Sequence, residues 1–314
     1  MDNEIRIGTR ESQLAVWQAN LVKEHLRQQG QSAKLVYISS DGDTDLKTPL
    51  YEIGVQGIFT KALDIALLNG EIDIAVHSMK DVPTMMAKGI VQAAVLQRAS
   101  YKDILVPGPG ANADHSFDAW DPNRVADPAI IATSSIRRKA QWLNKYPGDG
   151  VENLRGNVNT RLRKVAESNW SGAIFAAAGL ERIGLRPENA VDLDWMLPAP
   201  AQGAIVVVCR DDDHKSLLVC SKFHDEATAL CTAIERDFLC ALLGGCSTPI
   251  SALAAIEGDQ VVFKGNILSR DGREKREIQK VVPITRAADL GQEAAAELLR
   301  NGGQAILEGI RDGQ

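Results

Sequence analysis

The sequence predicts an α/β protein with two similar α/β domains and a small α+β domain at the C-terminus. Strands and helices alternate in the first hundred residues, the same order of elements recurs after residue 130, and the pattern changes near residue 224. A chain of 314 residues is long enough for several cores. We expect domain 1 to comprise residues 1–99 and about 200–221, domain 2 residues 100–199, and domain 3 residues 222–314.

The first hundred residues predict a sheet covered by helices. Residues 4–8 and 34–39 are strand-like, and residues 12–26 place apolar side chains at helical spacing. Residues 58–70 predict a second helix, which ends at a glycine and is followed by a buried strand over residues 72–78. This alternation is typical of a parallel sheet.

The second hundred residues repeat this order. Residues 130–141 have the form of residues 6–15: a strand, then Ser or Thr, then Arg, then a helix. Residues 156–180 repeat, less closely, the helix and strand pattern of residues 57–78. We therefore expect two facing domains with a cleft between them, and a strand within residues 198–209 that returns the chain to the first domain.

The last third has a different pattern. A long helix over residues 225–243 precedes three strand-like runs, which are joined at the turn signals 257–259 and 270–272. A final helix is expected over residues 289–310. This pattern predicts a small α+β domain.

One cysteine of the five stands in an unusual setting. Cys246 lies in the loop sequence "LLGGCSTPI", where two glycines and a proline shape the backbone after a helix. The cysteine spacing contains no C-x-x-C pair, so no metal site and no disulfide framework are predicted. Cys246 is the candidate reactive thiol.

The basic residues are concentrated in one region. Residues 134–164 carry eight basic and two acidic residues in a chain of net charge −6, which indicates a specific anionic ligand. Arginines next to Ser, Thr or Gly at helix starts can bind carboxylates or phosphates in two-point geometry. The sequence places Arg10, Arg137, Arg138, Arg155 and Arg161 in such settings, whereas Lys139, Lys145, Arg163 and Lys164 are expected to be surface charges.

A second candidate cluster follows the buried strand that ends at Ser78. Lys80 and Asp81 come directly after it, at the edge of the sheet where ligands bind in such folds. Lys80 suits an anion, and Asp81 suits a developing cation or a proton transfer. A mutual ion pair is the structural alternative for the two, and His77 is expected to be a packed strand residue.

The composition excludes several classes of protein. The negative net charge argues against general binding to nucleic acid or a membrane surface, and no apolar run is long enough for a membrane span. The first residues resemble a strand, and no targeting peptide is visible, so a cytoplasmic protein is expected. A monomer is expected by default.

Six ordered motifs make the sequence resemble the porphobilinogen deaminase (hydroxymethylbilane synthase) family. They are "IRIGTRESQLAVWQA", "DIAVHSMKDVPT", "ATSSIRRKAQ", "LRGNVNTRL", "PAPAQGAI" and "GGCSTPISALA". The resemblance implies two domains like those of periplasmic binding proteins and a third that carries the cysteine. It also implies a dipyrromethane cofactor held by a thioether to Cys246.

The reaction implied is the head-to-tail joining of four porphobilinogen molecules to this primer, with loss of ammonia at each step. Hydrolysis then releases hydroxymethylbilane, which is passed to uroporphyrinogen-III synthase. Each pyrrole bears two carboxylates, which accounts for the arginines. Loss of ammonia gives a cationic azafulvene that one carboxylate can stabilise.

The resemblance also assigns roles to individual residues. Asp81 matches the catalytic aspartate. The cofactor-binding positions are Ser78, Lys80, Ser135, Arg137, Arg138 and Arg161. The positions for substrate or growing chain are Arg10, Ser12, Arg155 and Arg182, with Gln18 in the same cleft.

Two positions depart from the family pattern: Gln56 replaces a loop lysine and Asn159 replaces a glycine. Two other functions are also compatible with parts of the sequence. A non-catalytic binder of a carboxylate ligand would explain the basic cleft, and a thiol hydrolase would use Cys246 with His77.

Overall fold

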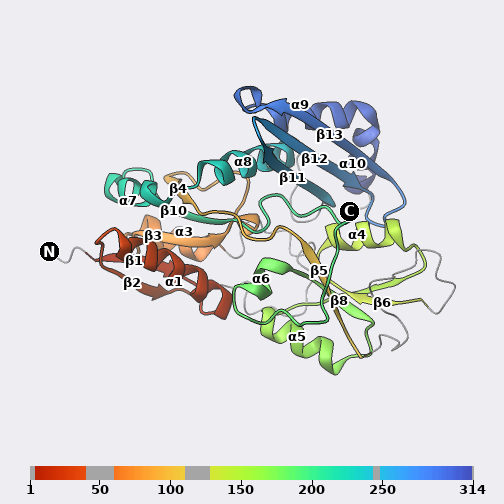
Figure 1. The fold of residues 1–314 in the computed structure, drawn as a ribbon, viewed down its shortest axis with the longest axis horizontal. Coiled ribbons are helices and arrows are strands. Elements are labelled where there is room, and N and C mark those ends of the chain that lie inside the picture. The colour runs from red at the N-terminus through yellow and green to blue at the C-terminus, as the bar shows by residue number, and fades with distance from the viewer. Residues whose placement is uncertain (1–3, 40–59, 110–127, 243–247, 313–314) are drawn as a thin grey trace.

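The computed structural model describes residues 4–39, 60–109, 128–242 and 248–312, which form three sheets with helices packed on them (Figure 1). The first sheet lies at the left of that view, the second at the lower right and the third at the upper right. Cys246 and Gln56 lie outside the described residues. Within the described ranges, no helix is long and apolar enough to cross a membrane.

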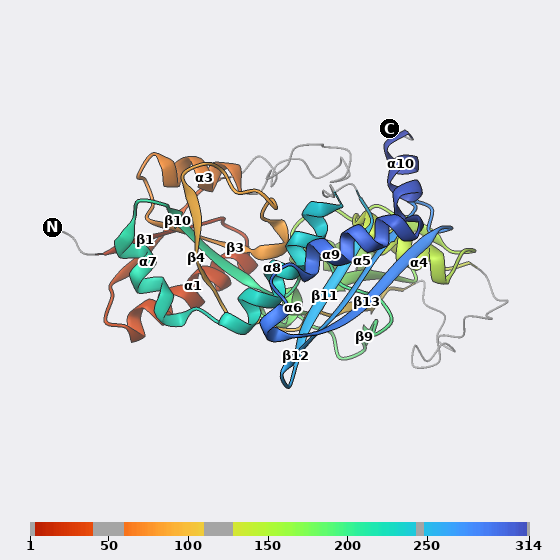
Figure 2. The same ribbon diagram turned by 90° about the horizontal axis from the view of Figure 1, so that it is seen from above.

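The first sheet has five strands in the order β2-β1-β3-β10-β4. β1 runs parallel to β2 and β3, whereas β10 is antiparallel to both of its neighbours. One apolar core lies between the sheet and helices α1 and α7, and another lies under α3 on the opposite face (Figure 2). The elements are β1 (Ile5–Thr9), α1 (Gln13–Gln28), β2 (Ala33–Tyr37), α3 (Lys61–Leu68), β3 (Ile74–Ser78), η2 (Met79–Asp81), β4 (Ile90–Val95), β10 (Ile205–Arg210), α7 (His214–Cys220) and η4 (Ser221–Phe223).

The second sheet has the order β7-β6-β8-β5-β9. β6 runs parallel to β7 and β8, and β5 is antiparallel to β8 and β9. The elements are β5 (Asp103–Pro107), β6 (Ile130–Ala132), α4 (Ile136–Lys145), β7 (Gly150–Glu152), α5 (Val158–Glu167), β8 (Gly172–Ala176), α6 (Ala177–Glu181) and β9 (Val191–Asp192).

The two sheets share one topology, which confirms the predicted fold class of two similar α/β units. The pattern of a parallel sheet is found in β1–β3 and β6–β8, but each sheet as a whole is mixed because it contains one antiparallel strand, β10 or β5. The sequence pattern does not show this direction, because a strand that is buried on both faces is apolar throughout, whichever way it runs. The returning strand predicted within residues 198–209 is β10, which lies between β3 and β4.

The chain crosses between the first and second sheets twice, once after β4 and once before β10, and these two segments lie side by side. The backbone N–H of Ala99 donates to the carbonyl of Gly203 at 3.1 Å, and that of Leu96 donates to the carbonyl of Ile205 at 3.0 Å. Gly203 has a φ of +89°, and a Cβ there would lie 2.7 Å from the carbonyl oxygen of Ser100. The close approach of the two crossings therefore depends on this glycine.

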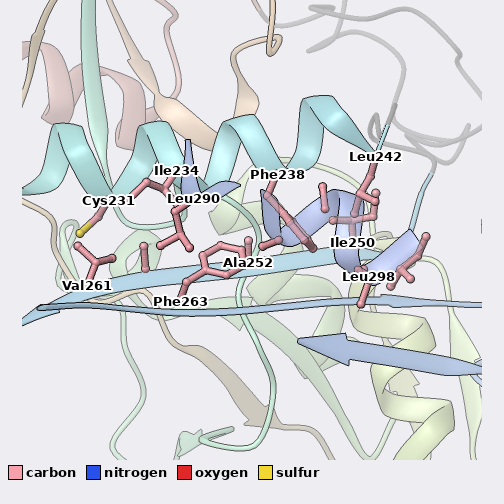
Figure 3. Packing of buried hydrophobic residues seen from close by; sticks show 14 of the residues in the cluster. Cys231, Ile234, Phe238, Leu242, Ile250, Ala252, Val261, Phe263, Leu290 and Leu298 are labelled. Carbon is pink, nitrogen blue, oxygen red and sulfur yellow. The ribbon is translucent and has the colours of Figure 1, made fainter. Parts of the chain in front are cut away.

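The third sheet is an antiparallel meander, β11-β12-β13, with helices on one face. Ile234 and Phe238 of α8, and Leu242 directly after this helix, pack on the strands, where the rings of Phe238 and Phe263 meet edge to face at 5.1 Å (Figure 3). The elements are α8 (Glu226–Ala241), β11 (Ile250–Glu257), β12 (Gln260–Leu268), β13 (Lys275–Pro283), η5 (Ile284–Arg286), α9 (Leu290–Leu298), η6 (Leu299–Gly303) and α10 (Gln304–Asp312).

The predicted final helix is interrupted. Asn301 and Gly302 leave helical geometry, with a φ of +97° at Gly302, so α9 and α10 meet at a kink. The apolar spacing of the segment does not reveal this break, but the glycine pair at residues 302–303 causes it, since glycine tolerates a positive φ.

The third unit docks on α4 of the second. The Asn144 side chain donates to the carbonyl of Gly272 at 2.7 Å, and Gln141 Nε2 donates to Ser251 Oγ at 3.1 Å. Gly272 has a φ of +75°, and a Cβ there would lie 2.5 Å from the carbonyl oxygen of Ala140. This turn fits against α4 only because it carries glycine.

Candidate active site

The Lys80–Asp81 pair lies directly beyond the end of β3. The chain turns from Ser78 into the short 3₁₀ helix η2, which places both side chains at the edge of the first sheet. Lys80 Nζ lies 2.7 Å from Asp81 Oδ1, and about a third of each side chain is exposed (34% and 31%). Burial would raise the pKa of Asp81, but Lys80, with Arg10 and Arg161, outweighs it and lowers the pKa. Asp81 is therefore an anion in a cationic setting.

Arg161 of α5 brings positive charge to Asp81 from the second unit, and Arg155 lies near Arg161. Arg155 is 3% exposed, and Arg161 is held by its Nε, which donates to the carbonyl of Gly156 at 2.7 Å. Burial, together with the nearby charges of Arg138 and Arg155, lowers the pKa of Arg161 to about 10, while Asp81 opposes this effect. Like charges gathered in this way favour a bound anion.

Arg10, Ser12 and Gln18 line the same edge of the first sheet. Arg10 follows β1, and Ser12 caps α1, its hydroxyl accepting from the backbone N–H of Ala15 at 3.4 Å. Gln18 is buried in α1 and its Nε2 donates to Ser78 Oγ at 2.9 Å. The structure thus joins two predicted site residues, Gln18 and Ser78, by a direct hydrogen bond.

Arg137 and Arg138 lie at the start of α4, and both pair with one buried carboxylate. Ser135 caps this helix. Arg138 donates from Nε and NH2 to Asp103 Oδ1 at 3.0 and 2.7 Å, and Arg137 NH1 lies 2.7 Å from Asp103 Oδ2. Burial would raise the pKa of Asp103, but the two arginines outweigh it and lower the pKa. These arginines are thus held by the protein itself.

Arg182 and Asn159 connect the two α/β units. Arg182 NH2 donates to the carbonyl of Gly203 in the crossover at 2.7 Å, and its guanidinium carbon lies 5.8 Å from the ring centre of Trp17. Asn159, the position where the family commonly has glycine, donates to Gln13 Oε1 at 2.9 Å. The side chain at this position therefore bridges α5 and α1.

A separate polar groove of about 560 Å³ lies at the other end of β1. Its lining residues include Arg6, Asp73 and Arg210, and none of the predicted site residues is among them. Arg6 and Asp73 form an ion pair at 2.6 Å. Nothing about this groove matches the predicted chemistry. Among the described residues, no group of three or more His, Cys, Asp or Glu could hold a metal ion.

Two family models match the chain. One, described as "Porphobilinogen deaminase, dipyromethane cofactor binding domain", matches residues 5–217, which include both mixed sheets. The other, described as "Porphobilinogen deaminase, C-terminal domain", matches residues 229–300. The chain belongs to the porphobilinogen deaminase family.

Relatives named porphobilinogen deaminase align along nearly the whole chain. The protein of Acidithiobacillus ferrooxidans is 37% identical over an alignment of 316 positions, which covers 99% of this chain and 100% of the relative. That of Pelobacter propionicus is 39% identical over 98% of this chain and 97% of the relative. Among solved structures, the methionine binding protein MetQ is similar at 11% identity and a TM-score of 0.42, over 72% of this chain and 92% of that one.

Membership of the porphobilinogen deaminase family confirms the predicted enzyme class and the predicted dipyrromethane cofactor in tetrapyrrole biosynthesis. The non-catalytic carboxylate binder and the thiol hydrolase are therefore set aside. The roles of individual residues stay predictions, and Cys246 lies outside the described part of the chain.

Several polar residues around this porphobilinogen deaminase site were not anticipated. Asp103 pairs with two predicted arginines, Arg137 and Arg138, and Gln202 in the crossover donates to Asp103 Oδ1 at 3.0 Å. Glu235 of α8, fully buried, pairs with Arg98 at 2.6 Å. The sequence offered one signal for each acid. Asp103 is an acidic residue at the start of the apolar strand "DILVP", and Glu235 stands next to a basic residue, Arg236, within an otherwise apolar helix.

His77 is buried in β3 as expected, and it predicts a pH dependence of stability. It is 7% exposed, its Nε2 has no hydrogen-bond partner among the described residues, and burial, with Arg10, lowers its pKa to about 4. The unfolded chain binds this proton near pH 6.5, so stability falls as the pH drops from there toward 4, by about 2 kcal/mol between pH 7 and pH 5. Urea unfolding of His77→Gln at both pH values should show a smaller loss than the wild type.

The exposed His214 is a matched control for this effect. His214→Gln should keep the wild-type dependence on pH. If His77→Gln kept it too, the neutral burial of His77 would not be the source of the acid sensitivity.

Proposed function

We propose that this chain joins four porphobilinogen molecules head to tail on a dipyrromethane linked to Cys246, releases ammonia at each step, and then frees hydroxymethylbilane by hydrolysis. The observation that supports the proposal is the anionic Asp81, which lies near cations from both α/β units, Lys80, Arg10 and Arg161. When bound, the dipyrromethane supplies the end to which the first substrate is joined. The product passes to uroporphyrinogen-III synthase, and we expect the enzyme to act as a cytoplasmic monomer.

Asp81 is proposed to stabilise the positive charge that develops on a substrate pyrrole as ammonia leaves. Its lowered pKa keeps the carboxylate charged, and a fixed charge beside the reacting atoms stabilises a cationic transition state without reorganisation. The carboxylate can also accept and return a proton at Oδ1 or Oδ2. Lys80, at 2.7 Å, holds the carboxylate in place and can contact a substrate carboxylate.

The basic residues are proposed to bind the carboxylates of the cofactor and of the growing chain. Arg161 fits this role because its pKa is lowered by burial and by Arg138 and Arg155, and an added carboxylate would offset that repulsion. We assign cofactor binding to Ser78, Lys80, Ser135, Arg137, Arg138 and Arg161. We assign substrate or chain binding to Arg10, Ser12, Gln18, Arg155 and Arg182.

Cys246 is proposed as the anchor partly because the buried thiols are poor nucleophiles. Burial raises the pKa of Cys209 and Cys231 to about 11 and that of Cys220 to about 12, so these three stay protonated. Cys240 is exposed on α8 and is therefore the matched control for a reactive thiol.

The intact mass of the denatured protein tests the anchor and the cofactor together. The wild type and Cys240→Ser should each carry an excess equal to two deaminated porphobilinogen units, and Cys246→Ser should lack it. Ammonia release from porphobilinogen should be lost only in Cys246→Ser. An excess that persisted in Cys246→Ser, or a wild type that gained no mass on incubation with porphobilinogen and released no ammonia, would contradict the proposal.

A further inference from the structure

Arg236, on α8 of the third unit, binds the backbone of the turn that carries Lys80 and Asp81. Its NH1 donates to the carbonyl of Val82 at 2.9 Å and to that of Met79 at 3.4 Å. Its NH2 donates to the carbonyl of Pro83 at 2.5 Å and to that of Thr84 at 3.3 Å. One guanidinium therefore holds backbone groups on both sides of Asp81.

The position of Arg236 on α8 explains why it faces this turn. Ile234 and Phe238 point into the core of the third unit (Figure 3). Arg236 is two residues from each, so its side chain leaves the helix about 200° away from theirs, toward the first sheet. Met79 and Val82 also pack into the apolar core under α3, the N–H of Met79 donates to the carbonyl of Ala204 at 3.0 Å, and that of Val82 donates to the carbonyl of Met79 at 3.1 Å.

The same helix also leads to the proposed anchor. α8 ends at Ala241, five residues before Cys246. Its buried Glu235 accepts from the backbone N–H of Ala201 at 2.6 Å and from that of Ala254 at 2.8 Å, so this stretch of helix is fixed to the crossover and to β11. The turn of Asp81 is thus bound to a stretch of α8 that is itself held in place by the crossover and β11.

We propose that Arg236 is a positioning residue for the reaction, which holds the turn that carries Asp81 in place. The inference rests on the proposed function of Asp81. The planar fork of arginine is needed because one side chain must serve four carbonyl groups that diverge along the turn. A lysine keeps the charge but, as a point donor, cannot reproduce this spread of bonds.

Arg210 provides a control that likewise binds backbone carbonyls, and its guanidinium also pairs with Asp213 at 3.3 Å. Its NH1 donates to the carbonyls of Leu67 and Ile72 at 2.8 and 2.9 Å, at the end of the first sheet remote from Asp81. Arg210→Met and Arg236→Met each remove a guanidinium from backbone carbonyls, so both should lower the melting temperature. Only Arg236→Met should loosen the turn that carries Asp81.

The test compares Arg236→Met, Arg236→Lys and Arg210→Met with the wild type, with kcat counted per cofactor-bearing molecule from intact mass. Arg236→Met should lose about 10- to 100-fold in kcat at a nearly unchanged KM, since a small displacement of a reacting group has effects of this size. The kcat of Arg236→Lys should lie between those of Arg236→Met and the wild type, and Arg210→Met should keep the wild-type kcat. Hydrogen exchange should accelerate in residues 79–84 of Arg236→Met alone.

Two results would overturn the inference. The first is equal kcat in Arg236→Met and Arg210→Met, and the second is unchanged exchange in residues 79–84 of Arg236→Met. If the wild type itself neither carried the cofactor nor released ammonia, the proposed function would fail. The exchange comparison would still decide whether Arg236 holds the turn, because it requires no turnover.

Discussion

Replacing Asp81 with asparagine should lower turnover by about 10³-fold, because it removes both a fixed negative charge and a proton acceptor from the proposed reaction centre. The fold should persist, since the side chain is partly exposed and its ion pair is local to Lys80. Ammonia release and product formation from porphobilinogen are the measurements. The lowered pKa of Asp81 adds a second expectation: the wild type should lose activity through protonation of this group only at a pH below the range in which an ordinary aspartate titrates.

Asp192 supplies the matched control for this substitution. It also pairs with two cations, Lys102 at 2.9 Å and Arg186 at 2.6 Å, but it lies on β9 and has no predicted part in the reaction. Asp192→Asn should keep turnover within about twofold, as expected for a surface pair. Wild-type turnover in Asp81→Asn would remove Asp81 from the mechanism.

Asp103→Asn should lower the free energy of unfolding by about 3–5 kcal/mol, the usual effect of removing one partner from a buried ion pair. The Asp103 side chain is fully buried between Arg137 and Arg138, whose side chains are 6% and 9% exposed. Without the carboxylate, two guanidinium groups would be left together in a poorly solvated place. Urea unfolding at neutral pH, followed separately for each cooperative transition, measures the loss.

Asp192→Asn serves again as the comparison, because its side chain is 30% exposed while it bridges the same number of cations. Its substitution should cost at most about 1 kcal/mol, as partly exposed pairs do. Equal losses in the two variants would mean that burial adds nothing to the Asp103 pairing. Asp103→Asn should also bind the cofactor poorly, since Arg137 and Arg138 would lose the group that orients them.

The sequence predicted the fold well where the chemistry was local. The alternation of elements, the recurrence of the strand–Ser/Thr–Arg–helix pattern and the hairpin turns of the third unit are each encoded within about twenty residues. The direction of β10 and β5 was not predicted, because it depends on where the crossover places each strand. The interruption at Gly302 was missed since the apolar spacing continues across it.

The candidate site was predicted in part for the same reason. Helix starts and strand ends located Arg10, Asp81 and Arg161, and those three are brought near one another across the two sheets. Their partners come from distant parts of the chain. Arg236 is 155 positions from Asp81, and nothing in either local sequence links the two. Such contacts arise from the packing of whole units and need a structure to be seen.

The placement of β10 sets an order on folding during synthesis. All strands of the second sheet lie between Asp103 and Asp192, so that sheet can close as soon as this stretch has left the ribosome. The first sheet cannot, because its fourth strand is made last and β3 and β4 wait for it with unpaired edges. Domains usually mature from the N-terminus onward. Here the nascent chain carries an open strand edge until residue 210 of 314 has been made, which is the interval in which a chaperone would be needed most.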